Sequence, residues 1–296
     1  MTNGHGPSII DPCSSVNHHR PGGVRSMRNR GLTALLVSLV VFSASAGAQA
    51  TAGLDPAALF EKGLNALEGS STTHSSADAI QYFRRSAELG FAPAQVALGY
   101  LYETGHVTTS DPGQALEWYK KAAAQGDPLA QWLVGRTIIA GEVPPRDLNE
   151  AASWLKKSAD QDDPFAKYLL GKIALERGDY ARAAEQFRAA AQQGLPPAQR
   201  HIALLLRAGQ GVPMDRFEAY VWMLASSDSG LHADPNDLQA LEAELSGSQI
   251  EQAKSKARDV EQATSRSVSG HGCTGWRGEY DEIPAPPPPD LQRFCR

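Results

Sequence analysis

Glycine recurs in this chain at an unbroken interval of 36 residues, at Gly63, Gly99, Gly135 and Gly171. Alanine keeps the same interval, at Ala58, Ala94, Ala130 and Ala166. A period of this length is typical of a helical solenoid, in which each repeat is one helix pair that cannot bury its apolar face alone. Solenoids usually present an extended surface to a partner. The repeat therefore predicts an all-α fold and favours a binding function over catalysis.

The first 50 residues of the 296-residue chain have the pattern of an export signal. A basic stretch at 27–31 precedes an apolar run of about 11 residues, too short for the ~20 that span a bilayer, and the segment ends in Ala48-Gln49-Ala50. We expect a signal peptide at 27–50 and a periplasmic or secreted protein with no membrane span after cleavage. The alternative is an uncleaved membrane anchor. Residues 1–26 are interpreted as an extension that is either not translated, because translation starts at Met27, or disordered.

The net charge excludes some classes of binding partner, and the cysteine content bears on the compartment in which the protein resides. Removal of residues 1–50 takes away four arginines and one aspartate, so the net charge changes from −5 to −8. Such a chain has no electrostatic footprint for nucleic acid or an anionic membrane. Cys273 and Cys295 then remain, and in an oxidising compartment they are expected to form a disulfide. Both lie in the proline-rich segment 266–296, which is either disordered or a clasped extended strand on the solenoid.

The body of the chain divides into five repeats, at 56–91, 92–127, 128–163, 164–195 and 196–231. The second helix of each is expected to begin at a capping residue, namely Ser75, Asp111, Asp147, Asp179 and Asp215. Three of these are followed three residues later by Gln114, Glu150 and Glu218, a pattern similar to a capping box. Glycines that can take the left-handed conformation follow the second helices at Gly90, Gly126 and Gly194. Two more helices from about Asp237, the second capped by Ser248, are predicted to close the C-terminal end.

The glycines inside the first helices need a separate reason, because glycine in a helix costs about 1 kcal/mol relative to alanine. We expect each of them to let the second helix of its repeat approach closely. The large side chains expected opposite them are Trp118, Trp154, Phe187 and Trp222. An aromatic stripe at the spacing of the repeat is interpreted as core and not as a ligand site.

The second repeat carries the clearest motif, with Ala94, Leu98-Gly99, Tyr102, Gly105, Asp111, Ala115, Trp118-Tyr119, Ala122-Ala123 and Gly126. It resembles the Sel-one-like repeat, a relative of the tetratricopeptide repeat, and the resemblance covers about 56–231. It implies a right-handed α/α superhelical solenoid of about five helix pairs with a C-terminal capping pair, over residues 51–265. It also implies an adaptor or scaffold for protein complexes. The third repeat departs from the motif at Ile138 and Asp162.

The resemblance also suggests a binding face. In tetratricopeptide-type repeats, the residue after the first-helix glycine and the one three positions further face the concave groove. The matching positions are Leu64, Leu67, Tyr100, Glu103, Arg136, Ile139, Lys172, Leu175, Leu204 and Arg207. Leu64 and Leu67 are expected to pack against the neighbouring helix. The others favour a peptide with apolar anchors and an acidic group, and Tyr100, Arg136, Lys172 and Arg207 are expected to be exposed and replaceable by alanine without loss of folding.

No catalytic pattern stands out in the sequence. It contains no G-x-S-x-G, P-loop or H-E-x-x-H motif, and its histidines lack the spacing of metal ligands. We expect no cofactor, metal or catalytic residue. The favoured function is an exported protein-interaction module or scaffold. The alternatives are an envelope glycan or peptidoglycan binder and an enzyme whose site is formed by the tail around His271, Trp276 and Tyr280.

The disulfide prediction can be checked directly. A bond between Cys273 and Cys295 closes a loop whose stabilisation is ~3 kcal/mol in the chain-entropy model. Mass spectrometry of the exported protein should find the two residues joined in one peptide pair. Two free thiols would contradict the prediction.

The signal-peptide prediction has its own measurement. N-terminal sequencing of the exported protein should begin at Thr51. A start elsewhere in the first 55 residues would move the boundary, and an intact N-terminus would overturn the predicted location.

Overall fold

The computed structural model describes residues 55–68, 73–105, 109–228 and 235–268. This part of the chain contains twelve helices and no strand, which confirms the predicted all-α fold. The helices are α2 (Pro56–Glu68), α3 (Thr73–Glu88), α4 (Ala92–Thr104), α5 (Pro112–Ala124), α6 (Pro128–Ala140), α7 (Leu148–Ala159), α8 (Pro164–Glu176), α9 (Tyr180–Ala191), α10 (Pro196–Ala208), α11 (Arg216–Asp228), α12 (Pro235–Ala243) and α13 (Gly247–Val268). The predicted extension at 1–26, the signal peptide at 27–50, and Cys273 and Cys295 lie outside the described residues.

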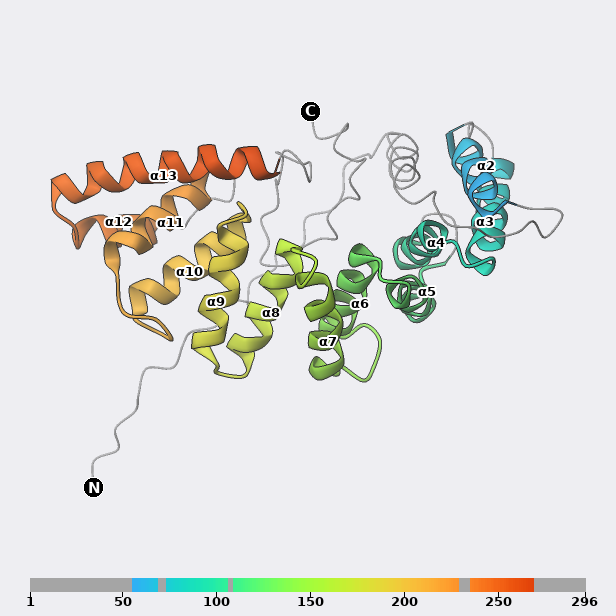
Figure 1. The fold of residues 1–296 in the computed structure, drawn as a ribbon, viewed down its shortest axis with the longest axis horizontal. Helices are drawn as coiled ribbons and strands as arrows, with labels where there is room; N and C mark the ends of the chain where they lie inside the picture. Colours follow the sequence, from blue (N-terminus) through green and yellow to red (C-terminus); the bar gives the residue numbers. More distant parts are fainter. Residues whose placement is uncertain (1–54, 69–72, 106–108, 229–234, 269–296) are drawn as a thin grey trace, which may run out of the picture.

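The helices pack in consecutive pairs, from α2 with α3 to α10 with α11. Each second helix also contacts the first helix of the next pair, so the pairs follow one another along a curved path (Figure 1). At the end of this path the long helix α13 lies against α11, with α12 beside it. The arrangement is an α/α solenoid, and α12 and α13 are the predicted capping pair.

Aspartates begin the second helices as predicted in four of the five repeats. The carboxylates of Asp111, Asp147, Asp179 and Asp215 each accept a hydrogen bond from a backbone amide three residues later, at 3.0, 3.2, 3.1 and 2.8 Å. The prediction for Ser75 is wrong. Helix α3 begins at Thr73 and has 16 residues, whereas the other second helices have 12 or 13. Ser75 therefore lies inside a helix that extends further toward its N-terminus.

The capping boxes are only half formed in the repeats. The amide of Asp111 donates to the carbonyl of Tyr102 (2.8 Å), and that of Asp215 donates to Leu206 (3.0 Å). These amides therefore tie the helix start to the first helix of the same repeat, and the residue three positions later is not their acceptor. A complete box is formed by Ser246 and Gln249, whose backbone amides donate to each other's side chains at 3.0 and 3.4 Å. The predicted cap Ser248 is wrong, because α13 already begins at Gly247.

Two or three residues after the end of three second helices, a glycine has the predicted left-handed conformation. Gly90, Gly126 and Gly194 have φ values of +89°, +94° and +87°. The third repeat has Asp162 at this position, with φ +69°, and it is the only non-glycine residue with positive φ in the described part of the chain. Its carboxylate accepts from the Gln193 side chain at 2.9 Å and pairs with Lys167. Asp162 thus has a backbone conformation that favours glycine, and its side chain contacts the next repeat.

The first-helix glycines do allow close helix contact. An ideal Cβ at Gly99 would lie 2.5 Å from Cε1 of Tyr119, and one at Gly135 would lie 2.4 Å from Cγ of Leu155. Gly63 and Gly171 meet Phe83 and Phe187 in the same way, each at 2.6 Å. A side chain larger than hydrogen would have to displace these buried groups.

The identity of the opposing side chains was predicted correctly only for Phe187. Trp118 and Trp154 do not face the glycines but lie half-buried at the side of the core. Lysine ammonium groups lie over their rings, Lys121 at 3.6 Å and Lys157 at 3.9 Å from the ring centroids. Since each residue turns a helix by about 100°, the next residue in the chain faces the glycine instead. Trp222 is buried, but the residue in register with Tyr119 and Leu155 is Met223.

Buried glutamines join successive repeats. Gln95 of α4 donates to the carbonyl of Ala87 (3.0 Å) and accepts from Gln125 (2.8 Å). One repeat later, Gln131 of α6 donates to a backbone carbonyl at 3.3 Å and accepts from Gln161 at 2.9 Å. A buried amide is costly unless its hydrogen bonds are made, so these contacts favour one position of each repeat against the next.

The close helix contact gives a stability prediction. We expect Gly99→Ala to lower the free energy of unfolding by about 1–3 kcal/mol, because displacement of the Tyr119 ring outweighs the gain of ~1 kcal/mol in helix propensity. The matched control is Gly247→Ala in α13, where an added Cβ meets no atom within 4 Å. Urea unfolding followed by circular dichroism measures both variants. Equal stability of the two would contradict the proposed reason for Gly99.

Candidate functional site

The predicted concave row is less open than expected. Its eight members on α4, α6, α8 and α10 are partly buried, and none is exposed: Tyr100, Glu103, Arg136, Ile139, Lys172, Leu175, Leu204 and Arg207. Leu64 is buried in the core, as predicted for it, with 1% of its surface exposed. The side chain of Leu67 lies outside the described part. The expected exposure of Tyr100, Arg136, Lys172 and Arg207 is therefore wrong.

Part of the row forms a polar cluster between the second and third repeats. The Glu103 carboxylate pairs with the Arg136 guanidinium and accepts a hydrogen bond from the Tyr119 hydroxyl at 2.7 Å. Burial, together with the nearby Glu103 carboxylate, holds the pKa of Tyr119 well above its usual range and also raises the pKa of Tyr100. Both phenols therefore stay neutral, and Glu103 is the anion that neutralises Arg136.

The cations of the row make further contacts within the chain. Arg207 donates to the carboxylate of Asp237 on α12 at 2.9 Å, which ties the last repeat to the capping pair. Lys172 places its ammonium 5.9 Å from the ring centroid of Tyr168, within the range of a cation–π contact. A variant with all four row residues changed to alanine would thus remove structural contacts together with any binding surface.

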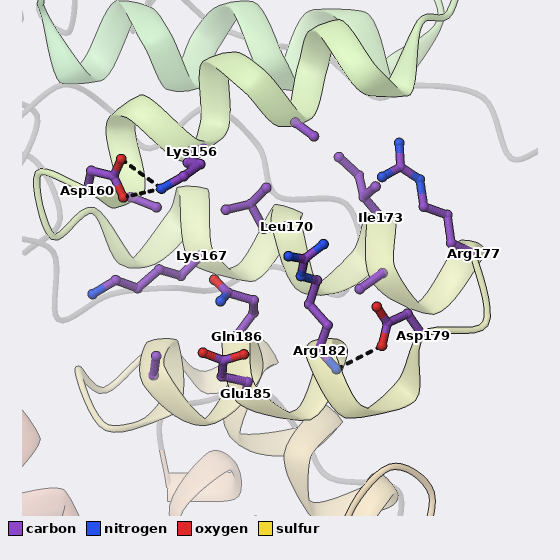
Figure 2. Close-up of a pocket in the computed structure, with 14 residues that line it drawn as sticks. Lys156, Asp160, Lys167, Leu170, Ile173, Arg177, Asp179, Arg182, Glu185 and Gln186 are labelled. Carbon is purple, nitrogen blue, oxygen red and sulfur yellow. Dashed lines mark hydrogen bonds and ion pairs between the residues drawn. The ribbon is translucent and has the colours of Figure 1, made fainter.

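The structure shows a groove that the sequence analysis missed. It has a volume of about 440 Å³ and lies between α7, α8 and α9 (Figure 2). Leu170, Ile173 and Ala174 of α8 give it an apolar lining, and short side chains from α7 and α9, Ala152 and Ala189, lie on either side. The groove therefore combines an apolar base with helix surfaces on both sides.

The groove and the row lie on opposite sides of α8. Successive residues turn a helix by about 100°, so the groove residues Leu170 and Ala174 point roughly away from the row residues Lys172 and Leu175. A ligand in the groove would thus contact the side of the solenoid opposite to the predicted concave face.

Charged side chains surround the groove, and their partners differ. Lys156 pairs with Asp160 at 2.8 Å, and Lys167 pairs with Asp162. The Arg177 guanidinium donates to the amide oxygen of Asn149 at 2.7 Å. Because this amide is neutral, the hydrogen bond does not offset the positive charge of Arg177.

Two charged side chains of α9 at the groove, Arg182 and Glu185, are available to bind a ligand. Arg182 contributes its backbone amide to the cap of α9, but its guanidinium has no hydrogen bond or ion pair with the described residues, and the same is true of the Glu185 carboxylate. Figure 2 shows Arg182 in the middle of the groove close to Leu170, with Arg177 at one end and the Lys156–Asp160 pair at the other.

A change of one residue type marks this groove in the sequence. Seven residues after the capping aspartate, the second, third and fifth repeats have Trp118, Trp154 and Trp222, whereas the fourth has Gln186. Gln186 lines the groove. Three residues after the cap, the other repeats have Gln114, Glu150 and Glu218, and the fourth has Arg182. Alignment of the repeats on their capping aspartates could therefore have identified both groove residues.

Neither metal coordination nor a membrane-crossing helix is found in the described segments. Within them, no group of three or more histidine, cysteine, aspartate or glutamate side chains is placed to hold a metal ion. None of their helices combines the length and the apolar character that a bilayer crossing requires. The residues that line the groove offer apolar contact, hydrogen bonding and ion pairing.

Comparison with known proteins agrees with the repeat architecture. The Sel1 repeat model matches residues 56–91, 92–127, 128–163, 164–195 and 196–231, the same boundaries as the predicted ones. No curated protein matches the chain.

Several solved structures are similar to this chain, including the following two. One is c5321, a protective antigen present in uropathogenic Escherichia coli strains that displays an SLR fold, with 27% identity and a TM-score of 0.62 over 74% of this chain and 49% of that one. The other is a Sel1 repeat protein from Oxalobacter formigenes, with 33% identity and a TM-score of 0.48 over 60% of this chain and 52% of that one. The chain thus spans about half the length of each. Since the five matched repeats cover more than half of the sequence, the chain belongs to the Sel1 repeat family.

Proposed function

We propose that this protein is an exported interaction module or scaffold whose solenoid binds a polypeptide partner. The observation that carries the proposal is the open groove between α7, α8 and α9, which has an apolar lining and charged side chains of both signs, two of them without a side-chain partner among the described residues. A polypeptide supplies both kinds of contact, because apolar and charged side chains alternate along it at short spacing. The export part of the proposal rests on the sequence pattern at 27–50.

The charges around the groove argue against a uniform polyanion as partner. Glu185 is free of an ion pair among the described residues, and Asp160 and Asp179 also border the groove. A nucleic acid or an anionic polysaccharide would have to approach these carboxylates, and the chain as a whole carries a net charge of −5. A peptide with one or two acidic groups meets the available arginines without this repulsion.

The predicted concave row remains a second candidate surface for the partner. Tyr100 and Ile139 could supply apolar contacts, but Arg136 and Arg207 are already ion-paired within the chain. An acidic partner would have to compete with Glu103 and Asp237 for these arginines. The groove therefore supports binding better than the row does.

The glycan alternative depends on aromatic rings that are open to a sugar. Trp118 and Trp154 are candidates because they are only half-buried, yet a lysine ammonium lies over each ring. A sugar that stacks on these faces would have to displace the lysines. Peptidoglycan binding is for this reason the second choice.

Site-specific photocrosslinking in living cells separates the candidates. A photoreactive amino acid in place of Lys156, whose side chain is 70% exposed at the groove, should form covalent adducts with a partner polypeptide. The same residue in place of Tyr100 tests the row, and in place of the exposed Gln81 on α3 it serves as the control. Mass spectrometry of the adducts identifies what is bound.

The result decides between a polypeptide and a glycan. Protein adducts at position 156 or 100 but not at 81 would support the proposed function and would show which surface is used. Retention of the full chain on purified peptidoglycan, with no protein adduct at either position, would contradict it and favour the glycan binder.

A further inference from the structure

We propose that the groove between α7, α8 and α9 binds an aromatic side chain of the partner polypeptide, with a carboxylate next to it in the partner's sequence. This inference rests on the proposed function, because it specifies the partner of that same groove. It is based on two observations. The fourth repeat lacks an aromatic residue that the other repeats have on the second helix, and an arginine at the groove has no side-chain partner among the described residues.

The missing residue is the aromatic side chain of the second helix. At the position of Gln186 the first repeat has Tyr82, and the second, third and fifth have tryptophans. Trp118 and Trp154 are half-buried against the core, and Trp222 is buried with 7% exposure. In four of five repeats the chain thus covers this part of its surface with its own aromatic ring, and only in the fourth does it not.

The groove that results has the dimensions and lining for a ring. Its volume of about 440 Å³ falls within the range of about 300–1,000 Å³ of ligand pockets. On α8, Leu170 is partly buried and provides apolar contact, whereas Ile173 has only 3% of its surface exposed. Burial of an aromatic side chain removes about 150–250 Å² from water, so a single ring can contribute a large part of the binding energy.

The charges indicate what lies beside the ring. Arg182 has a guanidinium without a partner in the described residues. Arg177 donates to the amide oxygen of Asn149 at 2.7 Å, and its charge adds to that of Arg146 in lowering the pKa of Glu176. In Figure 2, Arg182 extends into the middle of the groove, and Arg177 lies at one end of it. A carboxylate can accept two parallel hydrogen bonds from one guanidinium, so an acidic side chain of the partner fits beside Arg182. Glu185 on the same helix disfavours a longer acidic run.

Two substitutions test the two halves of the inference. Gln186→Trp restores the aromatic side chain of the other repeats, so it should fill the groove without loss of folding. Arg182→Glu reverses the free charge and places an acid in the first turn of α9, as in Glu150 and Glu218, where an acid favours the helix. Thermal unfolding of the full chain should show no loss of stability for either variant.

Each variant has a matched control elsewhere on the molecule. Gln81→Trp makes the same change at an exposed position of α3. Arg258→Glu makes the same charge reversal at an exposed position of α13. Neither control residue borders the groove.

The probe is a library of random linear peptides displayed on phage and selected on the full chain. We expect the selected peptides to share an aromatic residue next to aspartate or glutamate. Gln186→Trp and Arg182→Glu should each weaken their binding by about tenfold or more, equivalent to about 1.4 kcal/mol. The two controls should bind like the unchanged protein.

The possible failures can be told apart. Selected peptides without the aromatic–acidic pair, or peptides that bind Gln186→Trp as well as the unchanged chain, would overturn this inference and leave polypeptide binding in place. A protein that selects no peptide at all would count against the proposed function as well. Self-association of the unchanged chain that is lost in Gln186→Trp would assign the groove to a second copy, which also overturns the inference.

Discussion

In four of the five repeats, a glycine on the first helix contacts a large buried side chain on the second helix, and the fifth repeat has Ala203 at this position. At Gly99 and Gly135 the opposing atoms lie closer to an added Cβ than van der Waals contact permits. In these two repeats the helices can therefore approach as closely as they do only because glycine has no side chain. The spacing places Tyr119 and Leu155 in the core, whereas the preceding tryptophans lie only half-buried beside it.

The repeats are joined by contacts that recur with the same period. Buried glutamines such as Gln95 and Gln131 bridge the end of one repeat and the start of the next. Because each repeat contacts chiefly its neighbours, a change in one repeat alters the surface locally and leaves the array intact. The fourth repeat illustrates this, since Gln186 replaces an aromatic residue and a groove is found there.

The distribution of free and paired charges distinguishes the two surfaces. On the predicted concave row, Arg136 and Arg207 neutralise carboxylates of neighbouring helices and so stabilise the stacking of repeats. At the groove, Arg182 and Glu185 are left without such partners in the described residues. A charge that is already paired must lose one contact to gain another, whereas a solvated charge loses less on binding a ligand. This difference is the physical reason for proposing the groove, and not the row, as the binding surface.

The sequence alone determined the all-α fold, the five repeat boundaries, the capping aspartates and the role of the first-helix glycines, because these depend on local chemistry and on a period that is visible in the chain. It could not determine which neighbouring residue faces a glycine, since Trp118 and Tyr119 differ only by the rotation of the helix. It also could not show that Arg136 is paired, because Glu103 lies 33 residues away. The groove needed the tertiary structure most, since three helices build it and only their packing shows that the space beside Gln186 stays open.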